Sequence, residues 1–421
     1  MAVETLTADG RATALIGRAG TGKGVVIDTA ARAELAAGRE VIGVAVAGRT
    51  AQRLGEDSPA FCGRVRTLDG LVTALEHGRA NVGPQTTVYV DEAGMGDTAR
   101  LARLVDEVDH RGGSLVLVGD SRQLASVGAG GMFERLHDVV PAAELSEVRR
   151  TSDPAERVAW DALRSGDPAL AMAHYRERGA LHFSETRTSA VDRAARHYIE
   201  VATDAGHAEV ALMTDASNAE VDALNLRVQQ LRLEAGELGS ESVELPGSGH
   251  AIRAGDRLTW ARSMTTTEGP RVENGVRGEA IGVDEPSGSL RVRLDGSGRE
   301  LGVGPEETEA LRLGYAGHVY RQQGATVERA VVVTGGWETS RESAYVEASR
   351  ARGGVEWHVA RDQLGGADDA ERVNQLAARM RIEGAQMPSL LYDLTPTAVQ
   401  VDGPERWPEL EPEPAAMEID R

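Results

Sequence analysis

The chain has 421 residues, which is long enough for two or three domains with cores of their own. Its formal net charge of −20 excludes a surface that is basic all over, although a local basic channel remains compatible with it. No apolar run approaches the roughly 18 residues of a membrane helix. The first residues lack the pattern of a signal peptide, and Cys62 is the only cysteine, so we expect a soluble, cytoplasmic protein without internal disulfides.

The first 150 residues alternate short apolar runs with helical patterns. An apolar run at 12–17 leads into a Gly-rich loop, and helical spacing follows over 25–38. Further apolar runs lie at 40–48, 86–94 and 113–120. Short buried strands that alternate with helices indicate a parallel sheet covered on both faces, so we predict an α/β fold.

The Gly-rich loop reads GRAGTGKG, from Gly17 to Gly24. It follows an apolar strand and precedes a helix, as a phosphate-binding loop does. Gly17, Gly20 and Gly22 would let backbone amides close around phosphate oxygens beside Thr21 and Lys23. The usual pattern has Ser or Thr after the lysine, where the hydroxyl helps to hold Mg²⁺, but Gly24 occupies that position here.

Lys23 is the only lysine of the chain, whereas the other basic residues are all arginine. A bias that has replaced lysine with arginine elsewhere has spared this position. The compact ammonium of lysine fits beside a β/γ-phosphate better than a planar guanidinium does. We therefore expect Lys23 to bind phosphate in a working nucleotide site.

Two further motifs follow apolar runs of the same domain. VYVDEAG places Asp91 and Glu92 at the carboxyl edge of the sheet, where α/β proteins bind ligands. Asp91 would bind Mg²⁺, and Glu92 would orient and polarise an attacking water. In LVGDSRQL, Gln123 would sense the γ-phosphate with support from Asp120, although this Asp or Ser121 could instead cap a helix.

The second half of the chain repeats the α/β texture around a different segment. Apolar and helical runs at 208–217, 218–236 and 329–336 indicate a second α/β domain, and the short alternating runs of 249–306 indicate a small inserted antiparallel barrel. The acidic, Pro-rich tail at 394–421 is predicted to be disordered. The predicted parts are 1–150, 151–248 with 307–393, 249–306 and 394–421.

These motifs form an ordered set that resembles the helicase portion of MobF-type conjugative relaxase-helicases (TraA/TrwC-like), in the RecD-like branch of superfamily 1. The similar stretches follow one another as helicase motifs do. They are GRAGTGKG (motif I), AVAGRTAQRL (Ia), RTLDGLV (Ib), VYVDEAGM (II), LVGDSRQLASVGAGG (III), LSEVRR (IV), LGYAGHVYRQQGATVERAVVVTGG (V) and SAYVEASRAR (VI).

The resemblance implies two RecA-like P-loop NTPase domains with an inserted SH3-like β-barrel and ATP between the domains. It also implies Mg²⁺ as cofactor, and 5′→3′ translocation on single-stranded DNA. A separate relaxase or conjugation machinery would be a partner. The implied catalytic residues are Lys23, Glu92, Gln123, Arg150 and Arg350, the two arginines acting as arginine fingers. The implied nucleotide-binding residues are Gly17, Gly20, Thr21, Gly22, Lys23, Gly24, Gln323 and Gly324, with Asp91 on the metal. The implied DNA-binding residues are Arg49, Thr67, His318 and Tyr320.

The sequence also departs from the family pattern. The adenine-reading segment before motif I is missing or reduced, and the relaxase domain is absent, with no clustered His triad. In motif V, residues 318–324 read HVYRQQG instead of T-x-H-[KR]-x-Q-G, although Tyr320 can still stack on a base. Ala47 replaces a phosphate-contacting Thr of motif Ia.

Three functions remain open at this point. The first is an ATP-dependent DNA translocase or helicase. The second is a catalytically weak nucleotide-binding module that acts as an interaction or regulatory protein, which Gly24 favours. The third is a P-loop ATPase that acts on protein or RNA, because no residue names DNA directly.

Overall fold

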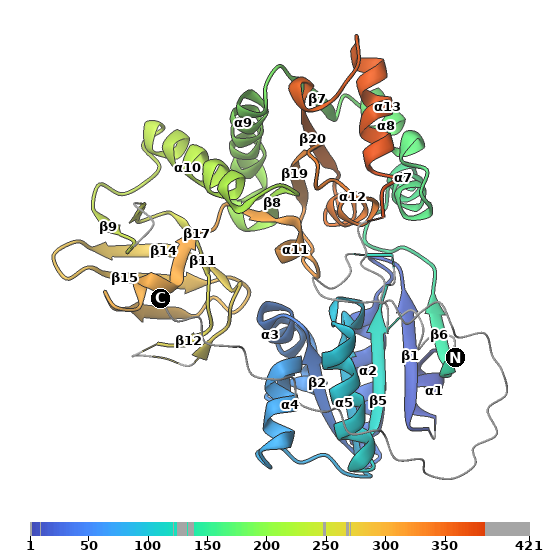
Figure 1. The fold of residues 1–421 in the computed structure, drawn as a ribbon. Helices are drawn as coiled ribbons and strands as arrows, with labels where there is room; N and C mark the ends of the chain where they lie inside the picture. The colour runs from blue at the N-terminus through green and yellow to red at the C-terminus, as the bar shows by residue number, and fades with distance from the viewer. Residues whose placement is uncertain are drawn as a thin grey trace, which may run out of the picture. The chain divides into compact units, whose positions relative to one another are not determined.

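The computed structural model describes residues 2–8, 10–120, 122–123, 133, 139–246, 250–266, 269 and 271–383. These residues form two parallel sheets covered by helices, and an antiparallel sheet whose strands come between those of the second parallel sheet (Figure 1). The prediction of an α/β fold is confirmed. In the described part of the chain, no helix is both long enough and apolar enough to cross a membrane. The tail at 394–421, predicted to be disordered, lies outside the described residues.

The first parallel sheet has the strand order β3-β2-β4-β5-β1-β6. Its strands are β1 (Ala12–Gly17), β2 (Glu40–Ala45), β3 (Val65–Thr67), β4 (Thr86–Asp91), β5 (Ser114–Gly119) and β6 (Ala142–Leu145). Its helices are α1 (Ala2–Thr7), α2 (Lys23–Ala36), α3 (Gly48–Asp57), α4 (Leu68–Glu76) and α5 (Thr98–His110). All paired strands run parallel, so their carboxyl ends meet at one edge.

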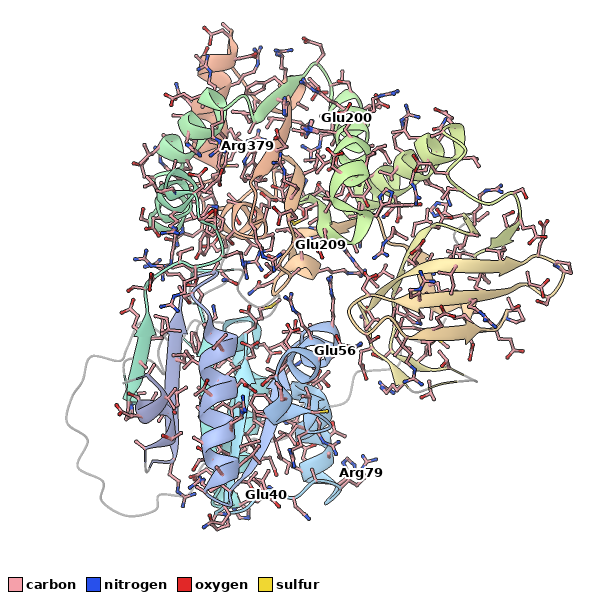
Figure 2. All side chains as sticks on the ribbon, turned by 180° about the vertical axis from the view of Figure 1, so that it is seen from behind. Glu40, Glu56, Arg79, Glu200, Glu209 and Arg379 are labelled. Carbon is pink, nitrogen blue, oxygen red and sulfur yellow. The ribbon has the colours of Figure 1, made fainter. Side chains whose placement is uncertain are left out.

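Strands of this sheet bury side chains on both faces, which explains their nearly continuous apolar sequences. On one face, Leu15 and Val116 pack with residues of α1 and α2. On the other face, Leu115 and Leu117 pack with residues of α4 and α5. The alternation along β5 divides its residues between the two cores, and the outer helix faces carry exposed charges such as Glu56 on α3 (Figure 2).

The second parallel sheet has the strand order β18-β8-β19-β20-β7. Its strands are β7 (Leu181–Ser184), β8 (Val210–Thr214), β18 (Ala316–His318), β19 (Arg329–Thr334) and β20 (Val355–Ala360). Its helices are α7 (Pro154–Ser165), α8 (Pro168–Glu177), α9 (Arg187–Ala205), α10 (Asn218–Glu234), α11 (Val319–Gln322), α12 (Arg341–Ala348) and α13 (Asp369–Arg379). Val331 and Val333 of β19 face α9 and α10, whereas Val332 faces α7, α8, α12 and α13.

Among the described residues, nine strands lie between α10 and β18 in the chain, and the larger sheet has the order β16-β15-β14-β11-β17. The strands are β9 (Ser242–Glu244), β10 (Ala251–Arg253), β11 (Arg257–Trp260), β12 (Met264–Thr265), β13 (Arg271–Val272), β14 (Arg277–Asp284), β15 (Ser289–Leu294), β16 (Glu300–Val303) and β17 (Leu311–Leu313). They begin before and end after the predicted segment 249–306. Their pairs are antiparallel, and a hydrophobic core of their own surrounds the fully buried Trp260.

A buried carboxylate joins this antiparallel segment to the second α/β part. Asp256 has no exposed surface and accepts hydrogen bonds from Tyr315 (2.6 Å) and from Gln229 of α10 (2.7 Å). Arg232 of α10 donates to the hydroxyl of Tyr315 at 3.0 Å. Because Tyr315 links β17 to β18, the network fixes the point where the chain leaves one sheet for the other.

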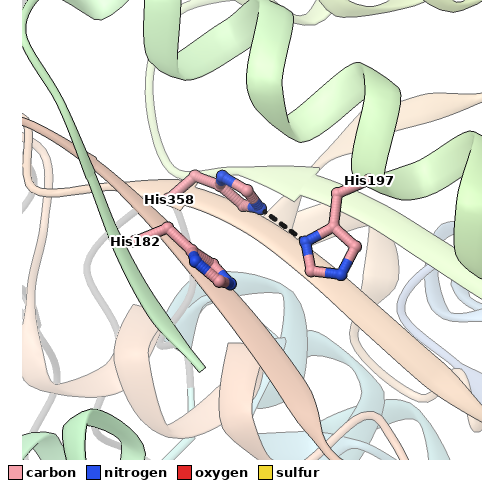
Figure 3. A group of neighbouring side chains, drawn as sticks. All are labelled: His182, His197 and His358. Atoms are coloured by element: carbon pink, nitrogen blue, oxygen red, sulfur yellow. Dashed lines mark hydrogen bonds between the residues drawn. The ribbon is translucent and has the colours of Figure 1, made fainter. Parts of the chain in front are cut away.

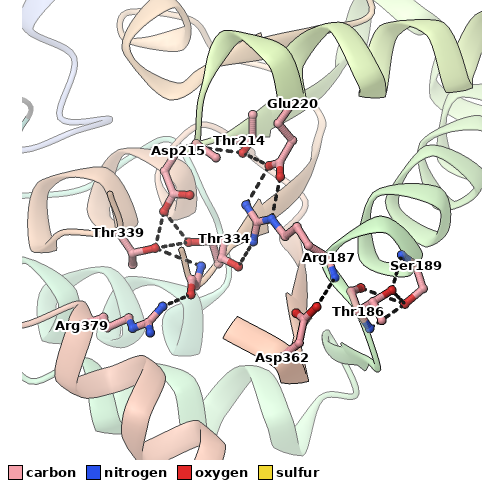
Figure 4. A network of polar contacts seen from close by, with 12 residues as sticks. Thr186, Arg187, Ser189, Thr214, Asp215, Glu220, Thr334, Thr339, Asp362 and Arg379 are labelled. Carbon is pink, nitrogen blue, oxygen red and sulfur yellow. Dashed lines mark hydrogen bonds and ion pairs between the residues drawn. The ribbon is translucent and has the colours of Figure 1, made fainter. Parts of the chain in front are cut away.

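The carboxyl edge of the second sheet is filled by a polar network of its own (Figure 4). Asp215, directly after β8, accepts hydrogen bonds from Thr334 (2.7 Å) and Thr339 (2.6 Å), and Arg187 pairs with Glu220 at 2.6 Å. Near Asp215 lies Glu347, which is fully buried and has no hydrogen-bond partner among the described residues. Burial, reinforced by the charge of Asp215, raises the pKa of Glu347 well above its usual value.

This buried carboxyl gives the stability of the fold a specific pH dependence. Above the ordinary glutamate pKa the unfolded chain releases this proton while the folded chain keeps it, so rising pH lowers the free energy of unfolding. We expect Glu347→Gln to remove this loss, so that the variant gains stability over the parent between about pH 5 and about pH 8, by at most ~1.4 kcal/mol per pH unit.

Urea unfolding monitored by circular dichroism at several pH values measures this difference. Glu234→Gln, at an exposed position of α10, is the control and should follow the parent at each pH. A Glu347→Gln variant that also follows the parent would contradict the inference.

Candidate nucleotide-binding site

The Gly-rich loop connects β1 to α2 and folds around the side chain of Lys23. The ammonium Nζ donates hydrogen bonds to the carbonyls of Gly17 (2.8 Å) and Arg18 (3.3 Å), and the hydroxyl of Thr21 donates to the same Arg18 carbonyl (2.9 Å). Gly22 caps α2 in the left-handed region with φ 85°. The helix therefore presents its positive N-terminal end beside a lysine that is held only by backbone oxygens.

The glycines of this loop differ in how much space a side chain would have at each position. A Cβ at Gly17 would lie 2.8 Å from both Lys23 Cγ and Thr21 Oγ1. A Cβ at Gly20, which has φ 74°, would lie 2.5 Å from the Cβ of Arg150. A Cβ at Gly24 would meet no atom within 4 Å. The position where a hydroxyl is usual therefore has room for one.

The predicted acidic pair stands at the same edge of the sheet, at the end of β4. Asp91 is the last residue of that strand, and its Oδ1 accepts a hydrogen bond from the backbone N–H of Glu92 at 2.9 Å. Burial and the charge of Glu92 raise the pKa of Asp91 to about 6, while Lys23 acts in the opposite direction. Among the described residues, Glu92 alone has a positive φ (51°) without being glycine. Such strained backbone is typical of functional positions.

The third motif places Asp120 and Gln123 after β5. Asp120 is 4% exposed and accepts hydrogen bonds from Arg164 (3.3 Å) and from the hydroxyl of Tyr345 (3.1 Å). Gln123 is buried, and its side-chain oxygen has no partner among the described residues. Residues 124–132, which complete the motif, lie outside the described residues.

Arg150 and Arg350 approach the loop from different parts of the chain. The backbone N–H of Arg150 donates to the carbonyl of Gly20 (3.1 Å), and its guanidinium donates to the carbonyl of Ser349. Arg350 is 1% exposed and donates to Val346 O (3.0 Å) and Ala325 O (3.3 Å). Burial, followed by the charge of Arg350, lowers the pKa of Arg150 to about 9. Among the described residues, neither guanidinium forms an ion pair with a carboxylate.

Motif V reaches the same place through Gln323 and Gly324. The amide of Gln323 donates to Glu92 Oε2 at 3.3 Å, and Gly324 adopts φ 79°. The carbonyl of Gly324 accepts a hydrogen bond of 2.6 Å from Arg53 of α3. Arg53 also lowers the pKa of Arg150, after burial and the charge of Arg350. The sequence analysis missed Arg53, which no local pattern distinguishes from the other arginines.

Tyr345 of α12 was missed as well. Its buried hydroxyl accepts a hydrogen bond from the backbone N–H of Ala19 in the Gly-rich loop (2.9 Å) and donates to Asp120 (3.1 Å). Burial and the charge of Asp120 raise the pKa of Tyr345, so the hydroxyl keeps its proton. One side chain thus joins the loop, the third motif and α12, which ends two residues before Arg350. Its only signal in the sequence was its place within SAYVEASRAR.

The four candidate DNA-binding residues divide into two groups. His318 caps α11 and stacks on Tyr320, with ring centroids 5.2 Å apart and Tyr320 39% exposed. Arg49 donates to the carbonyl of Arg321 at 3.5 Å, so it lies beside them. Thr67 contacts none of these three and caps α4 by accepting from Gly70 N at 3.1 Å.

Trp337 is an exposed aromatic that the sequence analysis did not single out. It is 85% exposed, and the next residue, Glu338, lies 3.7 Å from His318 Nε2. An indole that is so open to solvent beside the stacked pair is available for contact with a ligand.

The chain is similar to several known proteins. A family model described as an AAA domain matches residues 1–186. The conjugal transfer protein TraA of Agrobacterium fabrum is 29% identical over 353 residues, which are 83% of this chain. The ATP-dependent RecD2 DNA helicase of Deinococcus radiodurans is 28% identical over 320 residues, 75% of this chain. The chain spans 31% of the length of TraA and 42% of RecD2.

A solved structure shares the fold over most of the chain. It is a Pif1 helicase from Bacteroides in complex with ADP-AlF3 and single-stranded DNA, with a TM-score of 0.56 at 18% identity, and it covers 87% of this chain and 94% of its own. Over most of its length the chain is therefore similar in sequence to part of TraA and to part of RecD2, and it shares its fold with the Pif1 structure. The resemblance that its motif order predicted is confirmed.

The unequal glycines of the loop lead to a paired prediction. Gly20→Ala forces a side chain against Arg150 in the left-handed region, so we expect it to lower the free energy of unfolding by ~1–3 kcal/mol. Gly24→Ala points into open space in the first turn of a helix, and should be neutral or stabilising by up to ~1 kcal/mol. Chemical denaturation of both variants measures the contrast, and equal effects would contradict the close approach of Arg150 to the loop.

Proposed function

We propose that this chain is an ATP-dependent translocase or helicase on single-stranded DNA, moving 5′→3′, in conjugative DNA transfer or a related mobile-element process. One observation carries the proposal. Lys23, Asp91 and Glu92 at one sheet edge are met by Arg150 and by the buried Arg350, which lies two residues after the end of α12. Phosphoryl transfer needs such a meeting of lysine, carboxylates and arginines from separate elements.

The residues present fit a nucleoside triphosphate. Two buried guanidiniums without carboxylate partners are costly unless an anion joins them, and a polyphosphate beside Lys23 supplies that charge. Mg²⁺ bound there would neutralise negative charge that develops as the phosphoryl group transfers. Asp91 is the residue that would hold it, with Gly24 leaving space for water where a hydroxyl is usual.

The chain's own groups divide the remaining work. Lys23 exchanges its backbone carbonyls for the β/γ-phosphates, and Glu92 orients the attacking water. Arg150 and Arg350 balance the negative charge that spreads over the transferred group. Gln123, with an unpartnered side-chain oxygen, is placed to contact the γ-phosphate or the water. The backbone of Gly17, Gly20, Thr21 and Gly22 cradles the phosphates.

Hydrolysis would reach DNA through motif V. Gln323 contacts Glu92. Helix α11 begins four residues before Gln323, and the stacked His318 and Tyr320 lie at its start. We propose that Tyr320 stacks on a base and that Arg49 and Thr67 contact the strand, with phosphate charge dominating affinity. We further propose two RecA-like domains, 1–150 and 151–393, with an SH3-like barrel at 249–306. A separate relaxase or conjugation machinery would be a partner.

The first functional test is steady-state ATP hydrolysis in Mg²⁺, with and without a single-stranded oligonucleotide. We expect hydrolysis that the oligonucleotide stimulates severalfold, and a loss of at least ~100-fold in Lys23→Ala because no second lysine can replace it. Arg32→Ala removes an exposed cation from the same helix α2 and should keep the parent rate.

The outcomes separate the three functions left open by the sequence. Hydrolysis no faster than that of Lys23→Ala would overturn the enzyme and leave a nucleotide-binding module. Hydrolysis indifferent to single-stranded DNA, but stimulated by RNA or protein, would identify a different substrate for the same motor.

The second test concerns the missing hydroxyl. Gly24→Ser adds a side chain that the structure accommodates without contact. If the hydroxyl joins the metal, the Mg²⁺ concentration for half-maximal hydrolysis should fall severalfold in Gly24→Ser but not in Gly24→Ala. An unchanged requirement in both variants would mean that Asp91 and water already hold the ion without help from this position.

A further inference from the structure

Three histidines far apart in the sequence meet on the second parallel sheet (Figure 3). His182 lies on the edge strand β7, His358 on β20, and His197 on α9. His182 and His358 are register partners on adjacent parallel strands, and α9 packs over both. The sequence analysis did not single out these histidines, because strand pairing unites residues that no spacing connects.

The ring nitrogens converge on one point. One ligand atom from each histidine lies within 4.8 Å of the other two, and His197 Nδ1 is 3.2 Å from His358 Nε2. Two imidazole nitrogens on a tetrahedral zinc ion stand about 3.3 Å apart, given Zn–N bonds near 2.0–2.1 Å. The pair is therefore already at the spacing of two ligands on one ion, which is also the spacing of one shared proton.

One ring of the cluster is enclosed by the protein. His358 is fully buried, and its Nε2 already lies beside His197 Nδ1. His358 Nδ1 has no hydrogen-bond partner among the described residues.

The hydrogen bonds around His182 resemble those around a metal-binding histidine. Glu356 accepts a hydrogen bond from His182 Nε2 at 2.9 Å, and Arg329 holds the other oxygen of Glu356 at 3.3 Å. Metal-binding histidines typically donate their second N–H to such a carboxylate. Arg193, exposed on α9 one turn before His197, donates to His182 Nδ1 at 3.0 Å. This guanidinium, which also donates to the carbonyl of Phe183 at 3.3 Å, occupies the lone pair that a metal would take, and it must turn away for a metal to bind there.

We propose that His182, His197 and His358 bind one divalent transition-metal ion of the zinc type, with water in the fourth position. The ion fastens the edge strand β7 and helix α9 to β20. The negative charges of Glu356, and of Glu200 on the outer face of α9, partly balance the ion (Figure 2). The nucleotide site shares no residue with this cluster, so the proposal stands independently of the proposed function.

The test uses the full chain, made metal-free with a chelator and kept in excess Mg²⁺ to occupy carboxylate sites. Zn²⁺ is titrated by calorimetry, and Co²⁺ by its visible absorption. We expect one equivalent of Zn²⁺ to bind and the Tm to rise with Zn²⁺ concentration. Co²⁺ should give tetrahedral bands without a thiolate charge-transfer band, since Cys62 is not part of the cluster.

Three variants decide between a metal site and simple packing. His197→Ala, at a partly exposed position, should lose at least ~100-fold in Zn²⁺ affinity, beyond what removal of an outer-shell partner costs. His77→Ala, at an exposed position of the first half, should bind as the parent does. Arg193→Ala should bind Zn²⁺ severalfold more tightly, because no guanidinium then competes for His182 Nδ1.

The variants also keep the proposal open to refutation if one of them folds poorly. Absence of stoichiometric Zn²⁺ binding to the folded parent would overturn the site. Equal affinity in His197→Ala and the parent would place the ion elsewhere and would overturn it too. If circular dichroism shows that His197→Ala is unfolded, the Zn²⁺ affinity of Arg193→Ala decides alone. An affinity equal to that of the parent would then overturn the site, because the guanidinium would not compete with the ion for His182.

Discussion

The hydroxyl of Tyr345 is the contact on which the nucleotide site depends. It accepts the N–H of Ala19 in the Gly-rich loop and donates to Asp120, while its own helix ends two residues before Arg350. Ala19 also packs in the hydrophobic cluster that includes Trp160, Tyr345 and Ala348 of the second α/β part. The loop and the helix that precedes the distant arginine therefore share both a hydrogen bond and a hydrophobic cluster.

The charged side chains around that contact are not balanced by neighbours of opposite charge. Arg150 and Arg350 are buried without ion-pair partners among the described residues, and Asp91 is held against the charge of Glu92 with its pKa raised to about 6. Each half of the site is costly alone. A ligand that carries phosphates for the arginines and a cation for the acids relieves both costs together.

Local patterns were enough for the parts of the site that lie on one segment. Within about ten residues, the sequence around GRAGTGKG indicates a strand, a loop and a helix, and the sequence before Asp91 and Glu92 indicates a strand. The secondary structure predicted for both segments was therefore correct. Arg53 and Tyr345 act across the fold, and in a chain rich in arginine nothing local marks them. The cluster of His182, His197 and His358 was not predicted for the same reason, because strand register alone brings two of its members together. Gln123 shows an intermediate case, predicted from its motif and found buried with an unpartnered oxygen.

The two parallel sheets use their carboxyl edges in opposite ways. In the first, the edge carries a Gly-rich loop whose lysine donates hydrogen bonds to the backbone carbonyls of Gly17 and Arg18. In the second, the corresponding edge is filled by Asp215, Thr334, Thr339 and the Arg187–Glu220 pair (Figure 4). Hydrogen bonds and an ion pair among these side chains occupy most of their polar atoms. The second sheet instead meets the first through side chains that follow or belong to α11 and α12, since Gln323 contacts Glu92 and Tyr345 contacts Ala19 and Asp120.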